Sequence, residues 1–159
     1  MSTYISKAAF EEKHGNFRIS EFCITGQPPT KRIADIILSN HIVPMNLVRD
    51  AYGAPILVSM RSGYRPRAYE QSKGRTGNSQ HNFEESHEYG TGAVDYTSAR
   101  AKELIPFLLE HTCYQRICYY PNNNFVHCDY KPTSSGSREL YTAASPASKW
   151  KLSEVVKES

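Results

Sequence analysis

The stretch that decides the fold is NSQHNFEESHEYGTGAVDY, residues 78–96. Two histidines and a run of acids lie in a polar, loop-like segment that closes on Gly-Thr-Gly-Ala-Val-Asp-Tyr. This ending predicts a short strand that carries Asp95. A second short strand is predicted at NFVHCDY, residues 124–130, and it presents His127. We therefore expect the chain to be organised around side chains that these two strands bring together.

These side chains are of the types that bind zinc. Two neutral imidazoles and one carboxylate, with a fourth position open to water, make the tetrahedral site of catalytic zinc. Asp95 and His127 each close a short apolar segment, so both are expected at the rim of a sheet. Each residue alone has an ordinary alternative: the histidine as a hydrogen-bonded core residue, and Asp95 as the cap of a helix that begins near Ser98. Their coincidence favours a zinc site.

Length and composition limit the class of protein. The 159 residues suit one domain, residues 1–159, with its own hydrophobic core. The net charge of +3 is small and the basic residues are scattered, which argues against a nucleic-acid partner. The cysteines show no CxxC spacing, so free buried thiols are expected rather than a zinc site made of thiolates. They are Cys23, Cys113, Cys118 and Cys128.

Residues 1–15 lack the apolar segment of a secretory signal, and no apolar run reaches membrane-spanning length. We therefore expect a monomer that is made in the cytosol and has no membrane partner. If it acts outside the cell, something else must release it.

The hydrophobic pattern predicts an α+β fold: a small, mostly antiparallel sheet with helices packed on one side. Helices are expected at residues 4–14, 30–40, 44–52, 98–111 and 146–157, with a helical turn at 67–73. Strands are expected at residues 55–60, 115–120, 124–130 and, at the sheet edge, 138–141. Pro121-Asn122-Asn123 indicates a hairpin between the second and third of these strands.

Four short motifs resemble one known family. They are SGYRP at 62–66, SQH at 79–81, GAVD at 92–95 and FVHCD at 125–129. In this order they resemble the zinc peptidases typified by D-Ala-D-Ala carboxypeptidases, metallopeptidase family fifteen. Relatives of these enzymes include peptidoglycan L,D-endopeptidases, phage endolysins and the hedgehog signalling domain. The resemblance runs from about residue 17 to about residue 130.

The resemblance implies a set of roles. His81, Asp95 and His127 would bind Zn²⁺, and Arg65 would hold a substrate carboxylate or the charge that develops on the scissile carbonyl. The implied reaction is hydrolysis of a peptide bond in the stem peptides of peptidoglycan, and the implied partner is peptidoglycan or a muropeptide.

The chain departs from the family in the spacing of its first ligand. The family writes His-x-x-Gly-x-Ala-x-Asp, whereas His81 lies fourteen residues before Asp95, so a loop has been inserted. His87, eight residues before Asp95, is the alternative ligand. His81 is favoured because Ser79 and Gln80 precede it as the motif requires.

The second departure concerns the general base. Many members place Glu or Asp three residues before the last histidine, and Asn124 stands there, which cannot take a proton at neutral pH. Asp129 lies two residues beyond His127 on the same strand face, so it could be the base or could orient the imidazole. Asp129 is the favoured catalytic residue beside Arg65. The other candidates are acids of the inserted loop: Glu84, Glu85 and Glu88.

The hypothesis is therefore a zinc peptidase of the cell wall, a D,D-carboxypeptidase or endopeptidase. The lack of a signal segment would suit a phage-type lysis or virion enzyme. One alternative is a zinc-binding cell-wall module without catalysis. Another is a structural domain in which the histidines are buried and hydrogen-bonded.

Overall fold

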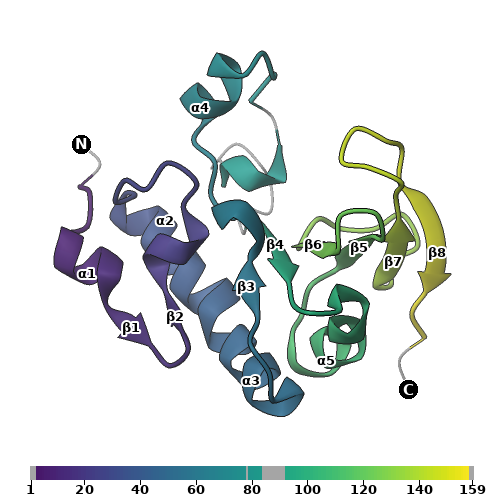
Figure 1. The fold of residues 1–159 in the computed structure, drawn as a ribbon. Helices are drawn as coiled ribbons and strands as arrows, with labels where there is room; N and C mark the ends of the chain where they lie inside the picture. Colours follow the sequence, from purple (N-terminus) through teal and green to yellow (C-terminus); the bar gives the residue numbers. More distant parts are fainter. Residues whose placement is uncertain (1–2, 78, 84–91, 158–159) are drawn as a thin grey trace.

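A six-stranded sheet forms the centre of the fold in the computed structural model, which describes residues 3–77, 79–83 and 92–157 (Figure 1). Its strand order is β3-β4-β6-β5-β7-β8. The β5–β7 ladder is parallel and the other ladders are antiparallel. The strands are β3 Leu57–Val58, β4 Ala93–Thr97, β5 Arg116–Tyr120, β6 Phe125–Asp129, β7 Glu139–Thr142 and β8 Lys151–Val155.

Strand alternation separates core from site. In β4 and β6, every second side chain points to the same face. Val94, Tyr96, Val126 and Cys128 belong to the main hydrophobic core, and all four are fully buried. The residues between them, Asp95 and His127 among them, point to the opposite face.

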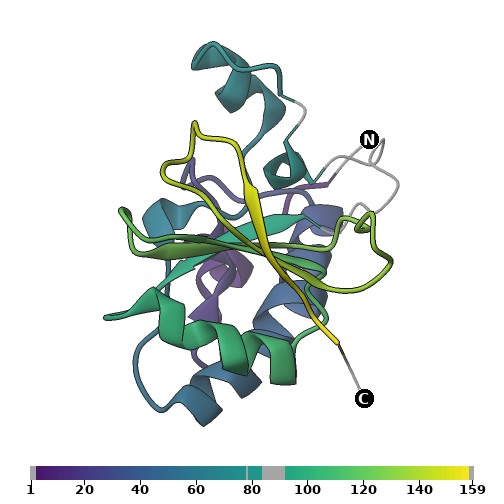
Figure 2. The same ribbon diagram turned by 90° about the vertical axis from the view of Figure 1, so that its right-hand side faces the viewer.

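Helices cover the core face of the sheet. Figure 2 shows α3 (Val43–Tyr52) and α5 (Leu104–His111) on one side of the sheet and α4 (Arg67–Ser72) on the other. The class is α+β, as predicted, but the helices do not all lie on one side. Side chains such as Met45, Val48, Leu104 and Leu108 from these helices are completely buried in the core.

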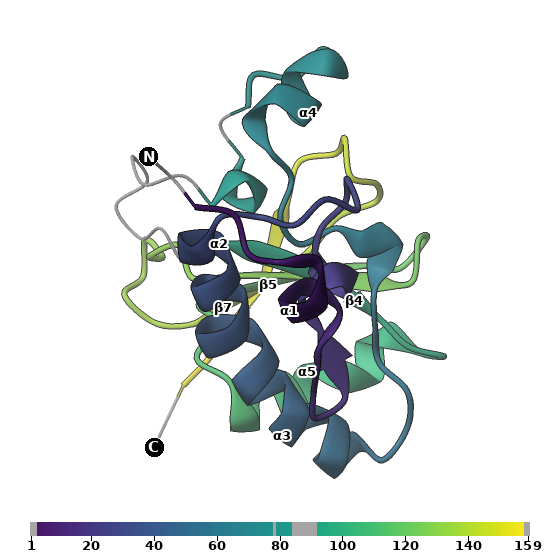
Figure 3. The ribbon, with the colours of Figure 1, turned by 90° about the vertical axis from the view of Figure 1, so that its left-hand side faces the viewer.

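The two helices predicted at 30–40 and 44–52 form one continuous rod (Figure 3). It consists of α2 (Lys31–Ile36), a π-helical segment Ile37–Ile42, and α3. Thr30 caps its start and Gly53, with φ +74°, ends it. The break predicted before Pro44 does not occur. Proline cannot donate to the carbonyl of Asn40, and the hydroxyl of Tyr130 donates to that carbonyl instead.

The N-terminal helix is shorter than predicted. α1 spans Lys7–Glu11, with the Ser6 side chain accepting from the backbone N–H of Ala9 at 3.1 Å. The chain then forms a small hairpin of β1 (Lys13–His14) and β2 (Phe17–Arg18). Gly15, with φ +68°, lies in the turn of that hairpin and does not end a helix. The strand predicted at 55–60 is likewise reduced to Leu57–Val58, followed by a 3₁₀ turn, Ser59–Arg61.

The hairpin predicted around Pro121-Asn122-Asn123 is confirmed, since β5 and β6 pair in antiparallel register on either side of it. Asn124 ends the turn with φ +52°. Its side chain accepts from the N–H of Ala101 at 2.8 Å and donates to the carbonyl of Ser98 at 2.8 Å. Asn124 therefore caps the helical segment that starts with a 3₁₀ turn at Ala101–Glu103, whereas the helix was expected to begin at residue 98.

The C-terminal prediction was wrong. Residues 146–157 were expected to form a helix, but β8 lies there and pairs with β7. As a result β7 is not an edge strand, because it has β5 on one side and β8 on the other. The five residues of β8 are exposed, so its backbone pairing with β7, rather than burial of a face, holds it in place.

Asn46 fastens the β1–β2 hairpin to α3, which yields a test of the fold. Its Oδ1 accepts from the N–H of Asn16 at 2.8 Å, and its Nδ2 donates to the carbonyl of His14 at 3.0 Å. We expect Asn46→Ala to lower the free energy of unfolding by about 1–2 kcal/mol in denaturant titration, because two backbone groups of the hairpin lose their hydrogen-bond partners. Leu47→Ala, an exposed position on the same helix, is the control and is expected to change little. Equal effects of the two changes would contradict this role.

Candidate metal centre

Asp95 and His127 face each other across two neighbouring strands. They are register partners in the β4–β6 ladder, so their side chains leave the sheet side by side. Asp95 Oδ1 lies 3.1 Å from His127 Nδ1. The pair belongs to interior strands and lies on the face of the sheet, away from the rim where the sequence had suggested it.

His81 joins them from a separate turn. The 3₁₀ turn Gln80–Asn82 is capped by Ser79, whose hydroxyl accepts from the N–H of His81. In return, the side chain of Asn82 accepts from the N–H of Ser79. His81 Nδ1 lies 2.9 Å from the carbonyl oxygen of Gly63, which can only accept a hydrogen bond. Nδ1 therefore carries the proton, and the lone pair of Nε2 points at Asp95 and His127.

The loop that holds SGYRP fixes this turn against the sheet. The N–H of Asp95 donates to the carbonyl of Ser62 at 2.9 Å. The N–H of Arg65 donates to the carbonyl of His81 at 2.8 Å. The side chain of Asn82 donates to the carbonyl of Arg65 at 2.7 Å. The three motifs that are far apart along the chain are thus bound to one another through their backbones.

Three ligand atoms converge at the spacing that a small cation requires. His81 Nε2 lies 3.1 Å from His127 Nδ1 and 3.4 Å from Asp95 Oδ1. Tetrahedral zinc with bonds of 2.0–2.1 Å separates its ligand atoms by roughly 3.3 Å. The three side chains are at most 8% exposed as residues. They form the His/Asp group that could hold a metal ion among the described residues.

The charges of the group also suit a cation. Burial alone would raise the pKa of Asp95, but the two histidines outweigh it and hold that pKa well below the ordinary range. Burial lowers the pKa of His81. For His127, burial acts downward, but hydrogen bonds with Asp129 and Asp95 prevail and raise the pKa to about 9. A metal ion would therefore take the place of a proton at this imidazole.

Asp129 supports His127 from behind. Its Oδ2 lies 2.8 Å from His127 Nε2, on the side of the ring away from the other two ligand candidates. Arg116 donates to both its oxygens, at 2.9 and 2.6 Å, and the N–H of Lys131 donates to Oδ1 at 3.0 Å. Asp129 is fully buried. Of the two roles that the sequence left open, this geometry favours orienting the imidazole over accepting a proton.

The indole of Trp150 also packs against the His127 imidazole, a contact that the sequence analysis did not predict. Its ring lies 5.1 Å from that of His127, edge to face, and 4.5 Å from the guanidinium of Arg116. Its Nε1 donates to the hydroxyl of Tyr120 at 2.7 Å. Trp150 is the single tryptophan of the chain, which was a signal that could have drawn attention to it. Because a helix was expected at 146–157, the sequence offered no reason to place Trp150 near the strands.

Arg65 lines the cavity beside the three ligand candidates. The cavity has a volume of about 240 Å³ and includes Asp95 in its wall. Arg65 Nη1 donates to the hydroxyl of Ser62 at 3.0 Å. Its Nε is 2.9 Å from Glu70 Oε1 but makes no hydrogen bond, so this contact is an ion pair alone. Apart from Arg65 and Asp95, the cavity is lined by Ile24, Ser59, Met60, Ser62, Tyr69, Arg75, Phe125 and Pro146.

Among the described residues, Asn124 does not line this cavity. Asn124, at the position expected for a base, is occupied with capping and points to Ala101 and Ser98. His87 and the three loop acids, Glu84, Glu85 and Glu88, lie outside the described residues. Cys113 is exposed, against expectation, and the other three cysteines are buried and free as predicted.

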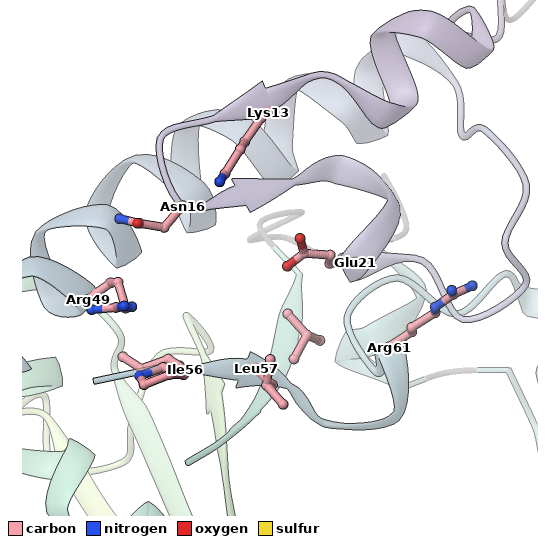
Figure 4. Close-up of a pocket in the computed structure, with 9 residues that line it drawn as sticks. Lys13, Asn16, Glu21, Arg49, Ile56, Leu57 and Arg61 are labelled. Carbon is pink, nitrogen blue, oxygen red and sulfur yellow. The ribbon is translucent and has the colours of Figure 1, made fainter. Parts of the chain in front are cut away.

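A different cavity, of about 430 Å³, lies along the outer edge of β3 (Figure 4). In Figure 4 the side chains of Lys13 and Glu21 project toward this strand from the β1–β2 side. The described residues that line it include no histidine or cysteine and none of the predicted site residues. It therefore offers no competing metal centre.

A buried His–Asp–His group on a sheet face, beside an arginine-lined cavity, could hold a metal ion of the kind that metal-dependent hydrolases use. The family model described as Peptidase M15 matches residues 16–129, and the chain belongs to this family of zinc peptidases. The match confirms the resemblance drawn from the four motifs. Comparison with curated proteins and with solved structures found no match. Within the described residues, no helix combines the length and apolar character needed to cross a membrane.

The geometry predicts one zinc ion per chain. Elemental analysis after expression with added zinc is expected to give a 1:1 ratio, and His81→Ala or His127→Ala is expected to lose most of the metal, because three protein ligands cannot be reduced to two without a large loss of affinity. His87→Ala is the matched control and is expected to keep it. Retention by His81→Ala together with loss by His87→Ala would assign the ligand to His87.

Asp129→Asn tests the support behind His127. An amide keeps the shape but loses the negative charge that holds the Nε2 proton, so zinc affinity is expected to fall about 10–100-fold in competition with a chelating dye. Turnover at saturating zinc is expected to persist. Unchanged affinity with abolished turnover would instead make Asp129 the general base.

Proposed function

We propose that the chain is a zinc-dependent peptidase that hydrolyses peptide bonds in the stem peptides of peptidoglycan. Membership of the M15 family supports a metallopeptidase. The observation that carries the proposal is the convergence of His81 Nε2, Asp95 Oδ1 and His127 Nδ1 within one ligand spacing, next to a cavity that Arg65 lines. The proposed place of action is the bacterial cell wall, as in phage lysis or virion enzymes, by a monomer of one peptidase domain.

The proposed metal ligands are His81, Asp95 and His127. Zinc held there would polarise the scissile carbonyl and lower the pKa of bound water toward ~7. The chain's own contribution is to keep the three ligands in place: the Gly63 carbonyl fixes one imidazole and Asp129 fixes the other.

Arg65 is proposed to bind substrate. Its guanidinium is planar and always charged, so it can hold a carboxylate, or the charge that develops on the scissile carbonyl, through two parallel hydrogen bonds. Arg65 and Asp95 line one cavity, which supports the proposal that an anion binds beside the proposed metal position.

The mechanism also needs a residue that acts as general acid and base. Asp129 has each oxygen engaged, and Asp95 is the one carboxylate among the described residues that line the cavity. The acids of the inserted loop are therefore the alternative source of a base. Triple replacement of Glu84, Glu85 and Glu88 by Gln is expected to reduce turnover at unchanged zinc content, measured on purified muropeptides. Wild-type turnover in the triple variant would exclude the loop acids.

The activity itself is tested with purified peptidoglycan and a D-Ala-D-Ala peptide. Zinc-loaded protein is expected to release new amino termini, and a chelator is expected to abolish the release until zinc is restored. If the protein binds zinc and peptidoglycan but cleaves neither substrate, the second candidate function applies, that of a non-catalytic module. Asn124 in place of an acid, tied into a helix cap, is the observation that favours that candidate.

Arg65→Lys separates a substrate role from a structural one. A lysine ammonium is a point charge that cannot make the two parallel hydrogen bonds. We therefore expect kcat/KM to fall by the factor that corresponds to a loss of ~2–4 kcal/mol of transition-state stabilisation. Zinc content and melting temperature are expected to stay close to those of the wild type. A large loss of thermal stability with normal specific activity would show that Arg65 serves only to hold its loop.

A further inference from the structure

β3 is a terminal strand of the sheet, and its outer edge has no strand partner among residues 3–77, 79–83 and 92–157. In an antiparallel pair, alternate residues direct their N–H and C=O groups away from the neighbouring strand. In β3 these groups point away from β4, to the side on which the 430 Å³ cavity lies (Figure 4). The backbone of β3 can therefore pair with one more strand.

The cavity follows this edge of β3. Four consecutive residues line it, namely residues 55–58. Their side chains alternate between the two faces, because Ile56 and Val58 are 4% and 8% exposed whereas Leu57 is 60% exposed. Residues whose side chains alternate in this way meet one cavity along the backbone edge that they share. A strand in the cavity would also bring a side chain beside the exposed Leu57.

Positive charges surround the cavity. Its lining includes Lys13, Arg49 and Arg61 but one acid, Glu21, so three cations and one carboxylate leave a net charge of +2. In Figure 4, Arg49 lies beside Ile56 at one end of the β3 edge, and Arg61 lies past the other end. Within the part of the chain that the structure describes, neither arginine side chain forms an ion pair or a hydrogen bond. Both charges are therefore available to an anionic ligand.

We propose that the outer edge of β3 is a docking site for an acidic, extended segment of a partner protein, which adds to the six-stranded sheet as a further strand. The backbone of this segment pairs with residues 56–58, and acidic side chains near its two ends contact Arg49 and Arg61. A phosphate polymer would use the cations but would leave the backbone groups of the edge unpaired. A peptide uses both features.

The docked segment is a partner and not a substrate, because the lining of this cavity includes none of the three metal-ligand candidates. The inference therefore goes beyond the peptidase activity proposed above and does not depend on it. Binding at the β3 edge and hydrolysis at the metal centre can be measured separately, so the failure of one proposal leaves the other untouched.

A short peptide tests the docking site. The probe is acetyl-Glu-Val-Thr-Val-Glu-amide, in which β-branched residues favour an extended chain between two acids. Calorimetric titration of the full chain is expected to show binding that weakens about tenfold when Gln replaces both Glu residues of the peptide. Amide hydrogen exchange at residues 56–58 is expected to slow in the presence of the acidic peptide, because their outward backbone groups become paired.

Variants of the chain test the charges. Arg49→Gln and Arg61→Gln are each expected to weaken binding of the acidic peptide about fivefold, the effect of losing one exposed ion pair. Both are expected to bind the Gln peptide as the wild type does. Arg100→Gln is the matched control, an exposed arginine beside Glu103, and is expected to bind the acidic peptide normally.

Three results would overturn the proposal. The first is that the wild type fails to bind the acidic peptide, or binds it no more tightly than the Gln peptide. The second is unchanged hydrogen exchange at residues 56–58 when the acidic peptide is saturating. The third is binding of inorganic triphosphate as tight as that of the acidic peptide, which would make this surface a general anion site with no role for the strand edge.

Discussion

The register between β4 and β6 is the constraint on which the rest of the structure depends. It sets Asp95 opposite His127 and, one residue along on each strand, sets Val94 opposite Cys128. A slip of one residue would exchange the two faces, so that a carboxylate would enter the core and apolar side chains would enter the site. Burial of Val94, Tyr96, Val126 and Cys128 under the helices therefore also holds the two ligand candidates together.

Around this pair the structure adds support in layers. The Gly63 carbonyl and Asp129 each fix one imidazole, and Arg116 fixes Asp129. Arg65 reaches the cavity from a loop that is hydrogen-bonded to both β4 and the His81 turn. Rigid strands thus position two ligand candidates, while Arg65 comes from a loop, where variation costs the core little.

The sequence predicted the parts of the site that short motifs carry. Through their resemblance to the family, SQH, GAVD and FVHCD selected three residues whose ligand atoms do converge. Asn124 was identified in the sequence because it lacks the acidic group that many family members have at this position. Its capping role depends on a contact with Ala101, which no local pattern reveals. Trp150 and Arg75 were missed because their positions depend on pairing of β8 with β7 and on an ion pair with Glu70. The continuous rod through Pro44 likewise depends on Tyr130, 90 residues away from Asn40.

The position of Trp150 gives the molecule a built-in optical reporter. It is the single tryptophan of the chain, and its indole packs against the His127 imidazole and the Arg116 guanidinium. It lies beyond residue 129, where the family match ends, so the C-terminal strand brings it to a centre whose other parts belong to the matched region. Any change in the charge of that imidazole alters the electric field at the indole. We therefore expect the fluorescence of the native chain to respond to the state of the centre without a label.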